Sequence, residues 1–369
     1  MRRGRLDIVR QRLGQHLGHR SLRGFETPED VVRSFGALQA QDYLGSLWAI
    51  GLRLPGARER DIERAVADRT IVRTWPMRGT LHFVAAADVR WMLALLTPAV
   101  LKRGLTRHRQ LGLDEAVFRK SRKALVKALQ GGRQRTRQNV YEVLEAAKVS
   151  TAGQRGIHIL WRLAQEGLLC FGARDGKQPT VVLLDEWIAP ARPIVEDEAL
   201  ALVARRYFAG HGPATLADFT WWSGLPAAKA RAALESVKGE LAQETLDETP
   251  YYFAEANGVS GGPPSRPPHV PRAHLLPAFD EFLVAYKDRS AVVAAPDAVG
   301  SAWNLLSPTY LIEGRVAGTW RRDLRGNEVV VTLAPFARLK VADAKAIERV
   351  VEEYGAFLGR APTMRVRPR

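Results

Sequence analysis

Hydrophobic and polar positions alternate with two different periods along this chain, and the order of these periods predicts the fold. Apolar residues at helical spacing form short amphipathic segments, and each group of such segments is followed by two short β-rich runs. Helix-turn-helix followed by a β-hairpin is the pattern of a winged helix. Because the pattern occurs three times, the sequence predicts an α+β protein with tandem winged-helix domains.

The clearest copy of this pattern spans residues 118–192. Thr136 is a predicted N-cap, and Thr151 begins a capping-box pattern just before the apolar periodicity of residues 156–167. Two runs around a turn at Asp175-Gly176 then predict a hairpin with strands Leu168–Phe171 and Thr180–Leu184.

The other two copies are less regular. In residues 193–256, Thr215 begins a capping-box-like pattern, and two further helices and two strands are predicted around it. In residues 1–117, Thr27 followed by Pro28 and two acidic residues is a strong helix start, and a β-hairpin is predicted near the end of the copy.

A Gly- and Pro-rich stretch, residues 257–271, predicts a linker between the winged helices and a C-terminal domain, residues 272–369. The domain has a β-rich character, which predicts a small β-barrel-like or sandwich fold closed by a helix at residues 343–358. The basic tail, residues 360–369, is expected to be mobile. The predicted strands are Ala291–Ala295, Thr309–Ile312, Arg315–Arg321 and Glu328–Leu333.

Charge points to a polyanionic partner. The 369 residues contain 55 Lys and Arg against 39 Asp and Glu, a net charge of +16. Residues 102–137 alone hold twelve cations and two acids, so they carry ten of the sixteen net charges. A solvated helical face is the ordinary explanation for one such run, but the excess over the whole chain favours phosphate contact.

Several classes of protein are excluded by what the sequence lacks. It has no P-loop, no dinucleotide-binding glycine fingerprint, no zinc-protease motif and no nucleophile elbow. Its single cysteine, Cys170, excludes an internal disulfide and a cysteine-based metal site, and we expect no cofactor. Without a signal peptide or an apolar stretch of about 18 residues, the chain is expected to be cytoplasmic and nucleoid-associated, with no membrane contact.

Residues 39–41, Gln-Ala-Gln, are the most informative short motif. Residues two apart share a face only on extended backbone, so the chain must leave the preceding helix here if both amides are to address one cleft. A pair of amides can hold a water molecule by accepting from it and donating to it without carrying charge. The simpler explanation is that Gln39 and Gln41 are two solvent-facing residues at a helix end.

Three longer blocks accompany this motif in a fixed order. They are Arg73–Val84 (RTWPMRGTLHFV), Leu276–Arg289 (LPAFDEFLVAYKDR) and Pro308–Arg321 (PTYLIEGRVAGTWR). With these blocks the chain resembles, over almost its whole length, the AlkZ-type winged-helix DNA glycosylases, in the branch that has Gln-x-Gln where other members have Gln-x-Asp. The resemblance implies excision of bulky N7-alkylated purines and unhooking of interstrand crosslinks, with Gln39 and Gln41 as catalytic residues.

Amide catalysis has its own chemical logic. An N-glycosidic bond breaks through an oxocarbenium-like sugar, which is usually stabilised by a carboxylate. A purine alkylated at N7 already carries a positive charge and leaves readily, so two neutral amides that orient a water are sufficient. If a carboxylate acts instead, the candidates are Asp42, Asp280 and Asp288. Their alternative roles are capping a turn, for Asp42, and pairing with Lys287 or Arg289, for the other two.

DNA contact is expected from polar residues within or beside the three blocks: Arg73, Arg78, His82, Lys287, Arg289, Arg321 and Arg322. A structural role for His82 and simple surface exposure for each arginine remain alternatives. Trp48, Trp75 and Trp320 are candidates for stacking on bases, although an apolar neighbourhood also fits core positions. No lysine lies close in sequence to the glutamine pair, which disfavours a lyase step.

The expected partner is therefore double-stranded DNA with N7-alkylpurine lesions, bound by a monomer that needs no protein partner. A DNA-binding regulator without catalytic activity is the main alternative. Three dissimilar copies without a long heptad seam disfavour it, because many regulators dimerise to match palindromic half-sites. An RNA-binding module would require stacked-aromatic signatures that the sequence lacks.

Overall fold

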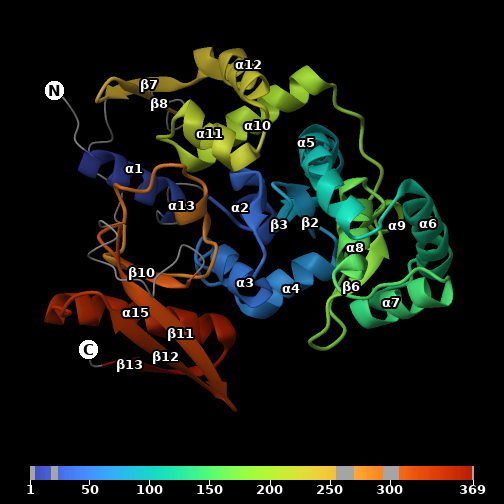
Figure 1. The fold of residues 1–369 in the computed structure, drawn as a ribbon. Helices are drawn as coiled ribbons and strands as arrows, with labels where there is room; N and C mark the ends of the chain where they lie inside the picture. Colours follow the sequence, from blue (N-terminus) through green and yellow to red (C-terminus); the bar gives the residue numbers. More distant parts are fainter. Residues whose placement is uncertain (1–4, 18–23, 255–269, 294–306, 368–369) are drawn as a thin grey trace.

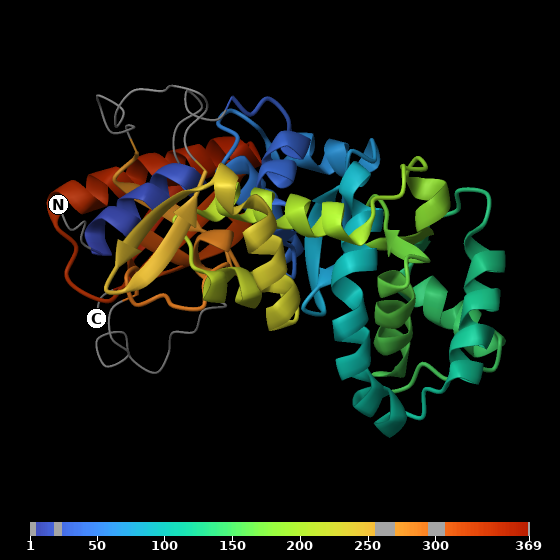
Figure 2. The ribbon, with the colours of Figure 1, turned by 90° about the horizontal axis from the view of Figure 1, so that it is seen from above.

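The computed structural model describes residues 5–17, 24–254, 270–293 and 307–367, and within them it is a mixed α+β protein, as predicted. The helices between residues 115 and 165 gather at one end of the molecule, and the C-terminal sheet lies at the other (Figures 1 and 2). The elements between residues 28 and 85 lie between these ends, so residues from distant parts of the chain can meet there.

The first part of the chain contains a helix start that was predicted in detail. Thr27 accepts a hydrogen bond from the backbone of Asp30, the Asp30 carboxylate accepts one from the Thr27 backbone, and Pro28 is the first helical residue. The elements of this part are α1 (Arg5–Leu17), α2 (Pro28–Phe35), β1 (Leu38–Gln39), α3 (Tyr43–Gly51), α4 (Glu59–Ala67), β2 (Ile71–Met77) and β3 (Thr80–Ala85).

The second part follows the predicted order of helices and strands with one error. Thr136 caps α7 as predicted, but the capping box predicted at Thr151 is wrong: α8 begins after Gln154, and the Thr151 hydroxyl donates to Glu145. The elements are η2 (Ala86–Asp88), α5 (Val89–Gln110), α6 (Glu115–Leu129), β4 (Arg135–Thr136), α7 (Arg137–Ala146), α8 (Arg155–Gln165), β5 (Leu169–Phe171), β6 (Thr180–Leu183) and α9 (Leu184–Trp187).

One six-stranded sheet joins these two parts. Its order is β1-β3-β2-β5-β6-β4, so the hairpin of the first part and the hairpin of the second lie side by side. They meet where Arg73 of β2 is opposite Phe171 of β5. Strand β1 is at the edge of the sheet, which leaves its outer side available to other parts of the chain.

The third part packs on the first. Thr215 and Asp218 form the predicted capping box at the start of α11. Helix α10 approaches the end of α2 closely, since a Cβ added at Gly210 would lie 2.8 Å from the Ser34 carbonyl oxygen. The elements are α10 (Glu196–His211), α11 (Leu216–Ser223), α12 (Ala227–Val237), η3 (Lys238–Glu240), β7 (Ala242–Leu246) and β8 (Thr249–Phe253).

The C-terminal part is an open sheet, so the prediction of a barrel is wrong. Its order is β13-β12-β11-β10-β9, and the indole N–H of Trp48 donates to the Leu275 carbonyl on the edge strand β9. The prediction of a mobile tail is also wrong, because β13 pairs in parallel with β12. The elements are β9 (Ala273–Leu276), α13 (Glu281–Val284), β10 (Thr309–Ile312), β11 (Arg315–Arg325), β12 (Glu328–Pro335), α15 (Val341–Leu358) and β13 (Ala361–Val366).

Two remaining expectations concern the segments around this sheet. Residues 291–293 of the strand predicted at Ala291–Ala295 form a turn and bend, and its last two residues lie outside the described part of the chain. Most of the predicted linker lies outside it as well. The three tryptophans considered for base stacking are core residues, with exposures of 3% for Trp48, 6% for Trp75 and 6% for Trp320.

Candidate active site

The Gln-x-Gln segment, residues 39–41, begins on extended backbone at the edge of the six-stranded sheet, where β1 ends at Gln39, and the chain bends at Gln41. The chain leaves α2 at Gly36, where a φ of 75° favours glycine, and β1 then pairs with β3 so that Gln39 is opposite His82. Gln39 is 9% exposed and Gln41 is exposed. The two glutamines therefore lie at a boundary between the protein interior and solvent.

The two side-chain amides are held in the same way by different donors. Gln39 Oε1 accepts from the guanidinium of Arg78 at 3.4 Å, and Gln41 Oε1 accepts from the Leu81 backbone N–H at 3.3 Å. Both donors can only donate, so each accepting atom must be the amide oxygen. Neither Nε2 group has a hydrogen-bond partner within the described residues. Each amide thus keeps its NH₂ group, and one oxygen lone pair, for a ligand.

The turn that carries Arg78 is strained. Met77 and Thr80 pair across β2 and β3, so Arg78 and Gly79 form a two-residue loop, with φ angles of 54° and 77°. This turn prefers Asn, Asp or Gly at its first position, and a left-handed conformation costs a residue such as arginine about 1–2 kcal/mol. Strain that the surrounding structure maintains is typical of functional sites.

Arg78 offsets this strain with contacts to three parts of the site. Its guanidinium donates to the Trp222 carbonyl at 2.6 Å and to His82 Nε2 at 3.2 Å, besides Gln39. His82 Nδ1 lies 2.9 Å from the Thr80 carbonyl and must donate to it, which leaves Nε2 as the acceptor for Arg78. Burial and the charge of Arg78 lower the pKa of His82 to about 3, so the ring is neutral.

His82 and Arg73 lie beneath the surface. His82 is 0% exposed and Arg73 is 7% exposed. Arg73 Nε and Nη2 donate to the Ala40 carbonyl at 3.0 and 2.9 Å, and burial lowers the pKa of Arg73 to about 10. In this conformation neither side chain reaches a phosphate, which does not fit the predicted DNA contact. Arg73 instead holds the backbone between the two glutamines.

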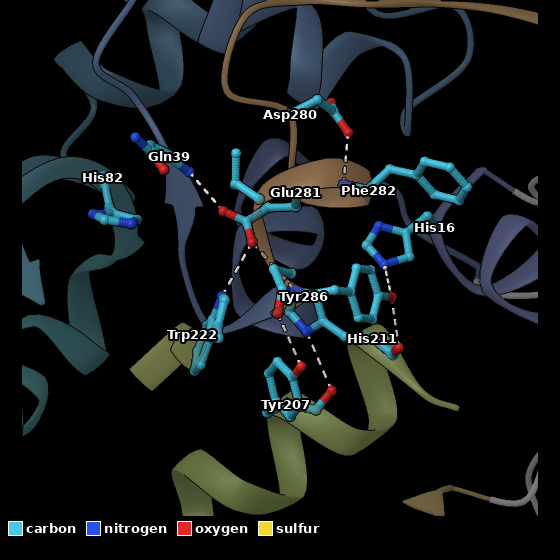
Figure 3. Close-up of polar contacts among 12 residues, drawn as sticks. His16, Gln39, His82, Tyr207, His211, Trp222, Asp280, Glu281, Phe282 and Tyr286 are labelled. Carbon is cyan, nitrogen blue, oxygen red and sulfur yellow. Dashed lines mark hydrogen bonds and ion pairs between the residues drawn. The ribbon is translucent and has the colours of Figure 1, made fainter. Parts of the chain in front are cut away.

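Glu281 is the residue that the sequence analysis missed. It is 1% exposed at the start of α13, and its carboxylate accepts from the Gln39 backbone N–H at 3.1 Å and from Trp222 Nε1 at 3.0 Å. Figure 3 shows it between these residues and His211. Burial opposes ionisation, but His211, whose Nε2 lies 3.4 Å from the carboxylate, and the charge of Arg78 outweigh it and lower the pKa of Glu281. The only signal in the sequence was its position beside Asp280 in the second block.

The three acids considered as alternatives to the glutamines do not join the glutamine pair. Asp280 forms a buried pair with Arg53, both of whose Nη atoms lie 2.8 Å from its oxygens, so its predicted partners, Lys287 and Arg289, are wrong. Asp288 accepts from the Ser290 backbone at 2.9 Å. Asp42 is at the N-cap position of α3 but makes no capping hydrogen bond through its side chain. None of these described contacts joins an acid to a glutamine of the pair.

Lys287 and Arg289 lie near an exposed tryptophan. Lys287 is exposed, and Arg289 is half-buried with its guanidinium carbon 5.3 Å from the centre of the Trp221 ring. Trp221 is 47% exposed and donates through Nε1 to the Val284 carbonyl, at the far end of α13 from Glu281. The Arg289 guanidinium therefore lies beside the tryptophan that is bonded to the end of α13.

The last two predicted contacts belong to β11 of the C-terminal sheet. Arg321 is exposed, and Arg322 is half-buried and donates to the Tyr354 hydroxyl at 2.5 Å. Tyr354 belongs to α15, which packs on this sheet. Arg321 is thus free to meet a phosphate, whereas Arg322 is already engaged with the protein.

The basic run at residues 102–137 lies on α5, α6 and the start of α7. Nine of its exposed cations have no ion-pair or side-chain hydrogen-bond partner within the described residues: Lys102, Arg103, Arg109, Arg119, Lys120, Lys123, Lys127, Arg133 and Arg137. The positions on α6 fall opposite its buried face, which includes Phe118 and Leu125. This surface offers charge to a polyanion without breaking internal pairs.

The described residues contain no metal site and no membrane-spanning helix. Within those ranges, no group of three or more His, Cys, Asp or Glu could hold a metal ion. The single cysteine is a buried free thiol whose pKa is raised by burial. Within the same ranges, none of the helices combines the length and apolarity needed to span a bilayer.

Known proteins are similar to this chain in sequence and in fold. The family model of AlkZ-like DNA glycosylases matches residues 32–357. An interstrand DNA cross-link repair glycosylase from Streptomyces sahachiroi is 28% identical over 340 residues, which cover 87% of this chain and 88% of that protein. The solved structure of the S. sahachiroi DNA glycosylase AlkZ superposes over 100% of both chains with a TM-score of 0.76 and 23% identity. The chain is therefore a DNA glycosylase and belongs to the AlkZ-like family.

Proposed function

We propose that this DNA glycosylase is monofunctional and hydrolyses the N-glycosidic bond of N7-alkylated purines in double-stranded DNA, including bulky adducts and interstrand crosslinks. The observation that carries the proposal is the arrangement of Gln39 and Gln41. Their amide oxygens are held by protein donors, and their NH₂ groups are open. Neutral amides suit a substrate whose base is already cationic, because such a base leaves without a general acid.

The reaction that we propose is a simple hydrolysis. The oxygen of a water held by the two amides bonds to C1′ of the deoxyribose as the C1′–N9 bond breaks. The bonding electrons move into the purine, whose positive charge is neutralised, and a proton of the water is released to solvent. The product is an abasic site, and no covalent intermediate with the enzyme forms.

For DNA binding, we propose that phosphates contact the cations that remain exposed. Arg321 and Lys287 fit this role directly, and Arg289 and Arg322 lie beside them with part of their surface open. The unpaired cations of α5 and α6 extend the proposed phosphate-binding surface away from the glutamine pair. Arg78 has its guanidinium in the network at Gln39, so we assign it, with His82 and Arg73, to the support of the site.

We interpret residues 1–117, 118–192 and 193–256 as three winged helices, and residues 272–369 as a β-rich domain reached through the linker 257–271. The support is the repeated order of helices followed by a hairpin. The curated relative is named for interstrand cross-link repair. We propose the same work here, as DNA repair or as self-resistance to an alkylating natural product, by a monomer acting on nucleoid DNA in the cytoplasm.

An abasic-site assay tests the proposal. Duplex DNA with a single N7-methylguanine, and a second duplex with a bulky N7 adduct, are incubated with the protein and then treated with hot alkali. We expect strand cleavage at the lesion by the natural protein and strong loss of it in Gln39→Ala and Gln41→Ala. Gln243→Ala, at an exposed position on β7, is the matched control. Undiminished cleavage by both site variants would show that the amide pair is not the active site.

The same assay addresses the substrate class and the absence of a lyase step. Cleavage that appears before alkali treatment would indicate a lyase and contradict the monofunctional mechanism. Release of unmodified guanine or of neutral damaged bases at a similar rate would contradict the dependence on a cationic base. Cleavage of the bulky adduct alone would restrict the substrate class to large lesions.

A further inference from the structure

The carboxylate of Glu281 occupies the place of a missing strand beside the catalytic segment. In an antiparallel pair, successive N–H groups point alternately toward the partner strand and away from it. Here the Ala40 N–H donates to the Leu81 carbonyl on the β3 side, at 2.7 Å, and the Gln39 N–H points outward to Glu281 Oε1, at 3.1 Å. Because β1 is an edge strand, no other strand supplies this acceptor.

The second carboxylate oxygen ties the same point to the third part of the chain. Glu281 Oε2 accepts from the Trp222 indole at 3.0 Å and lies 3.4 Å from His211 Nε2. Both partners come from the α10–α11 segment, whereas Gln39 is 242 positions away from Glu281 in sequence. Figure 3 shows Glu281 where these elements meet. One side chain thus fixes the relative position of three parts of the molecule at the catalytic segment.

Glu281 holds the backbone of Gln39, and Arg78 holds its side-chain amide. Glu281 accepts from the Gln39 backbone, and Arg78 donates to the Gln39 side-chain oxygen at 3.4 Å. Trp222 connects them, since its indole donates to Glu281 and its carbonyl accepts from Arg78. The guanidinium of Arg78 is half-buried, and Glu281 supplies a countercharge to it inside this network. The orientation of the Gln39 amide therefore depends on a carboxylate that cannot itself reach solvent.

Burying a carboxylate to hold the catalytic segment costs free energy. An ion removed from water loses several kcal/mol of hydration, and a well-packed apolar residue of similar size is often at least as stabilising. Ordinary packing therefore does not account for a glutamate at this position. What an apolar residue cannot do is accept from the outward N–H of Gln39 and balance Arg78.

We propose that Glu281 is a positioning residue of the glycosylase: it sets the orientation of the Gln39 amide through the Gln39 backbone and through Arg78. The inference rests on the proposed role of Gln39 in catalysis. It predicts that loss of the Glu281 carboxylate slows the chemical step without weakening DNA binding, because its described partners are Gln39, Trp222 and His211 and none is a cation assigned to phosphate contact.

The test separates rate from affinity. Single-turnover base release from N7-methylguanine duplex and the Kd for the same duplex are measured for Glu281→Ala and Glu281→Gln, with melting temperatures. For Glu281→Ala we expect a rate loss on the order of 100-fold, as for a small misplacement of a catalytic group, and a nearly unchanged Kd. Glu281→Gln keeps an acceptor for the Gln39 N–H and loses only the charge, so it should recover part of the rate.

Leu283→Ala is the matched control for stability. Leu283 lies on the same short helix, is equally buried at 1% exposure and packs in the C-terminal core. It should lower the melting temperature without a comparable change in rate. If Glu281→Ala folds and releases the base at the natural rate, the inference is overturned. It is also overturned if Glu281→Ala and Leu283→Ala lose the same amount of rate for the same drop in melting temperature. If Glu281→Ala does not fold, the same comparison is made with Glu281→Gln.

Failure of the inference and failure of the proposed function give different results. Natural protein and Gln39→Ala are measured in the same experiment. If the natural protein releases the base and Gln39→Ala does not, a natural rate in the Glu281 variants overturns only the role of Glu281. If Gln39→Ala retains full activity, the proposed function fails, and the inference fails with it.

Discussion

The interior around Gln39 and the outer face of α6 use charge in opposite ways. Around Gln39, Arg78 is half-buried and Glu281 is buried, and each donates to or accepts from fixed partners. On α6, cations such as Lys120 and Lys123 are exposed and have no partner among the described residues. Buried charges have a geometry that the fold imposes, whereas the exposed ones keep theirs free for a ligand.

This difference separates two tasks of one DNA glycosylase. A fixed network can orient an amide and a water to within a fraction of an ångström, but it cannot follow a flexible polyanion. A solvated cationic face attracts phosphate over several ångströms and tolerates many geometries, but it cannot orient a reacting group. Changes to the interior should therefore affect stability and rate, and changes to the α6 face should affect affinity and its salt dependence.

The largest effect is expected at the buried ion pair next to the network. Asp280→Ala leaves the guanidinium of Arg53, which is 5% exposed, without its carboxylate, and such a loss costs about 3–5 kcal/mol. Urea unfolding measures it. Asp323→Ala, which breaks an exposed pair with Arg325, is the control, with an expected change of about 0–1 kcal/mol. If the two variants lose similar amounts of unfolding free energy, buried and exposed charges do not differ in the way described.

A smaller effect, on affinity alone, is expected from Lys120→Ala, Lys123→Ala and Lys127→Ala combined. Each phosphate contact contributes roughly 0.9 to the slope of log affinity against log salt, so three contacts contribute about 2.7. Between 50 and 200 mM salt the natural protein should then lose about 40-fold more affinity than the variant. Filter binding at several salt concentrations measures this. Arg122→Ala, which removes a cation that is paired with Glu166, is the control. An unchanged slope in the triple variant would exclude this face from the DNA interface.

The next effect concerns a buried histidine that, unlike His82, lacks partners. Neither ring nitrogen of His274 has a hydrogen-bond partner among the described residues, and burial lowers its pKa from 6.5 to about 3. The unfolded chain binds one proton more between these values, so stability falls as pH falls, by about 2 kcal/mol at pH 5. His274→Phe, beside a cavity of about 550 Å³, should remove this part of the pH dependence. The free energy of unfolding is measured for both proteins at pH 7.5 and pH 5. If both lose the same stability between these pH values, His274 is not the cause of the loss.

The smallest effect is expected for the pH dependence of the reaction. The two glutamines do not titrate, the pKa of His82 is lowered to about 3, and that of Arg73 is lowered only to about 10. The pKa of Glu281 is lowered as well, so the network keeps one protonation state near neutrality. Single-turnover rates should be nearly constant from about pH 6 to 9. A limb near pH 6 would indicate a titrating acid or histidine in the reaction.

The amino-acid sequence by itself determined the local elements of this protein. Thr27, Thr136 and Thr215 cap the helices that their patterns predict, because a cap needs only neighbours within one turn. The departure of the chain from the helix before residues 39–41 followed from the spacing of the glutamines, given that both amides address one cleft. The family also followed from sequence, since the three blocks recur in a fixed order.

The tertiary structure alone decided the partners of buried groups and the edges of sheets. Glu281 meets Gln39, and Asp280 meets Arg53, across more than 200 positions, a distance at which no local pattern selects one partner. The closed barrel and the mobile tail were wrong for the same reason: whether β13 adds to an open sheet depends on packing between distant strands. A sequence states which residues can form a network, but only the fold brings their atoms within bonding distance.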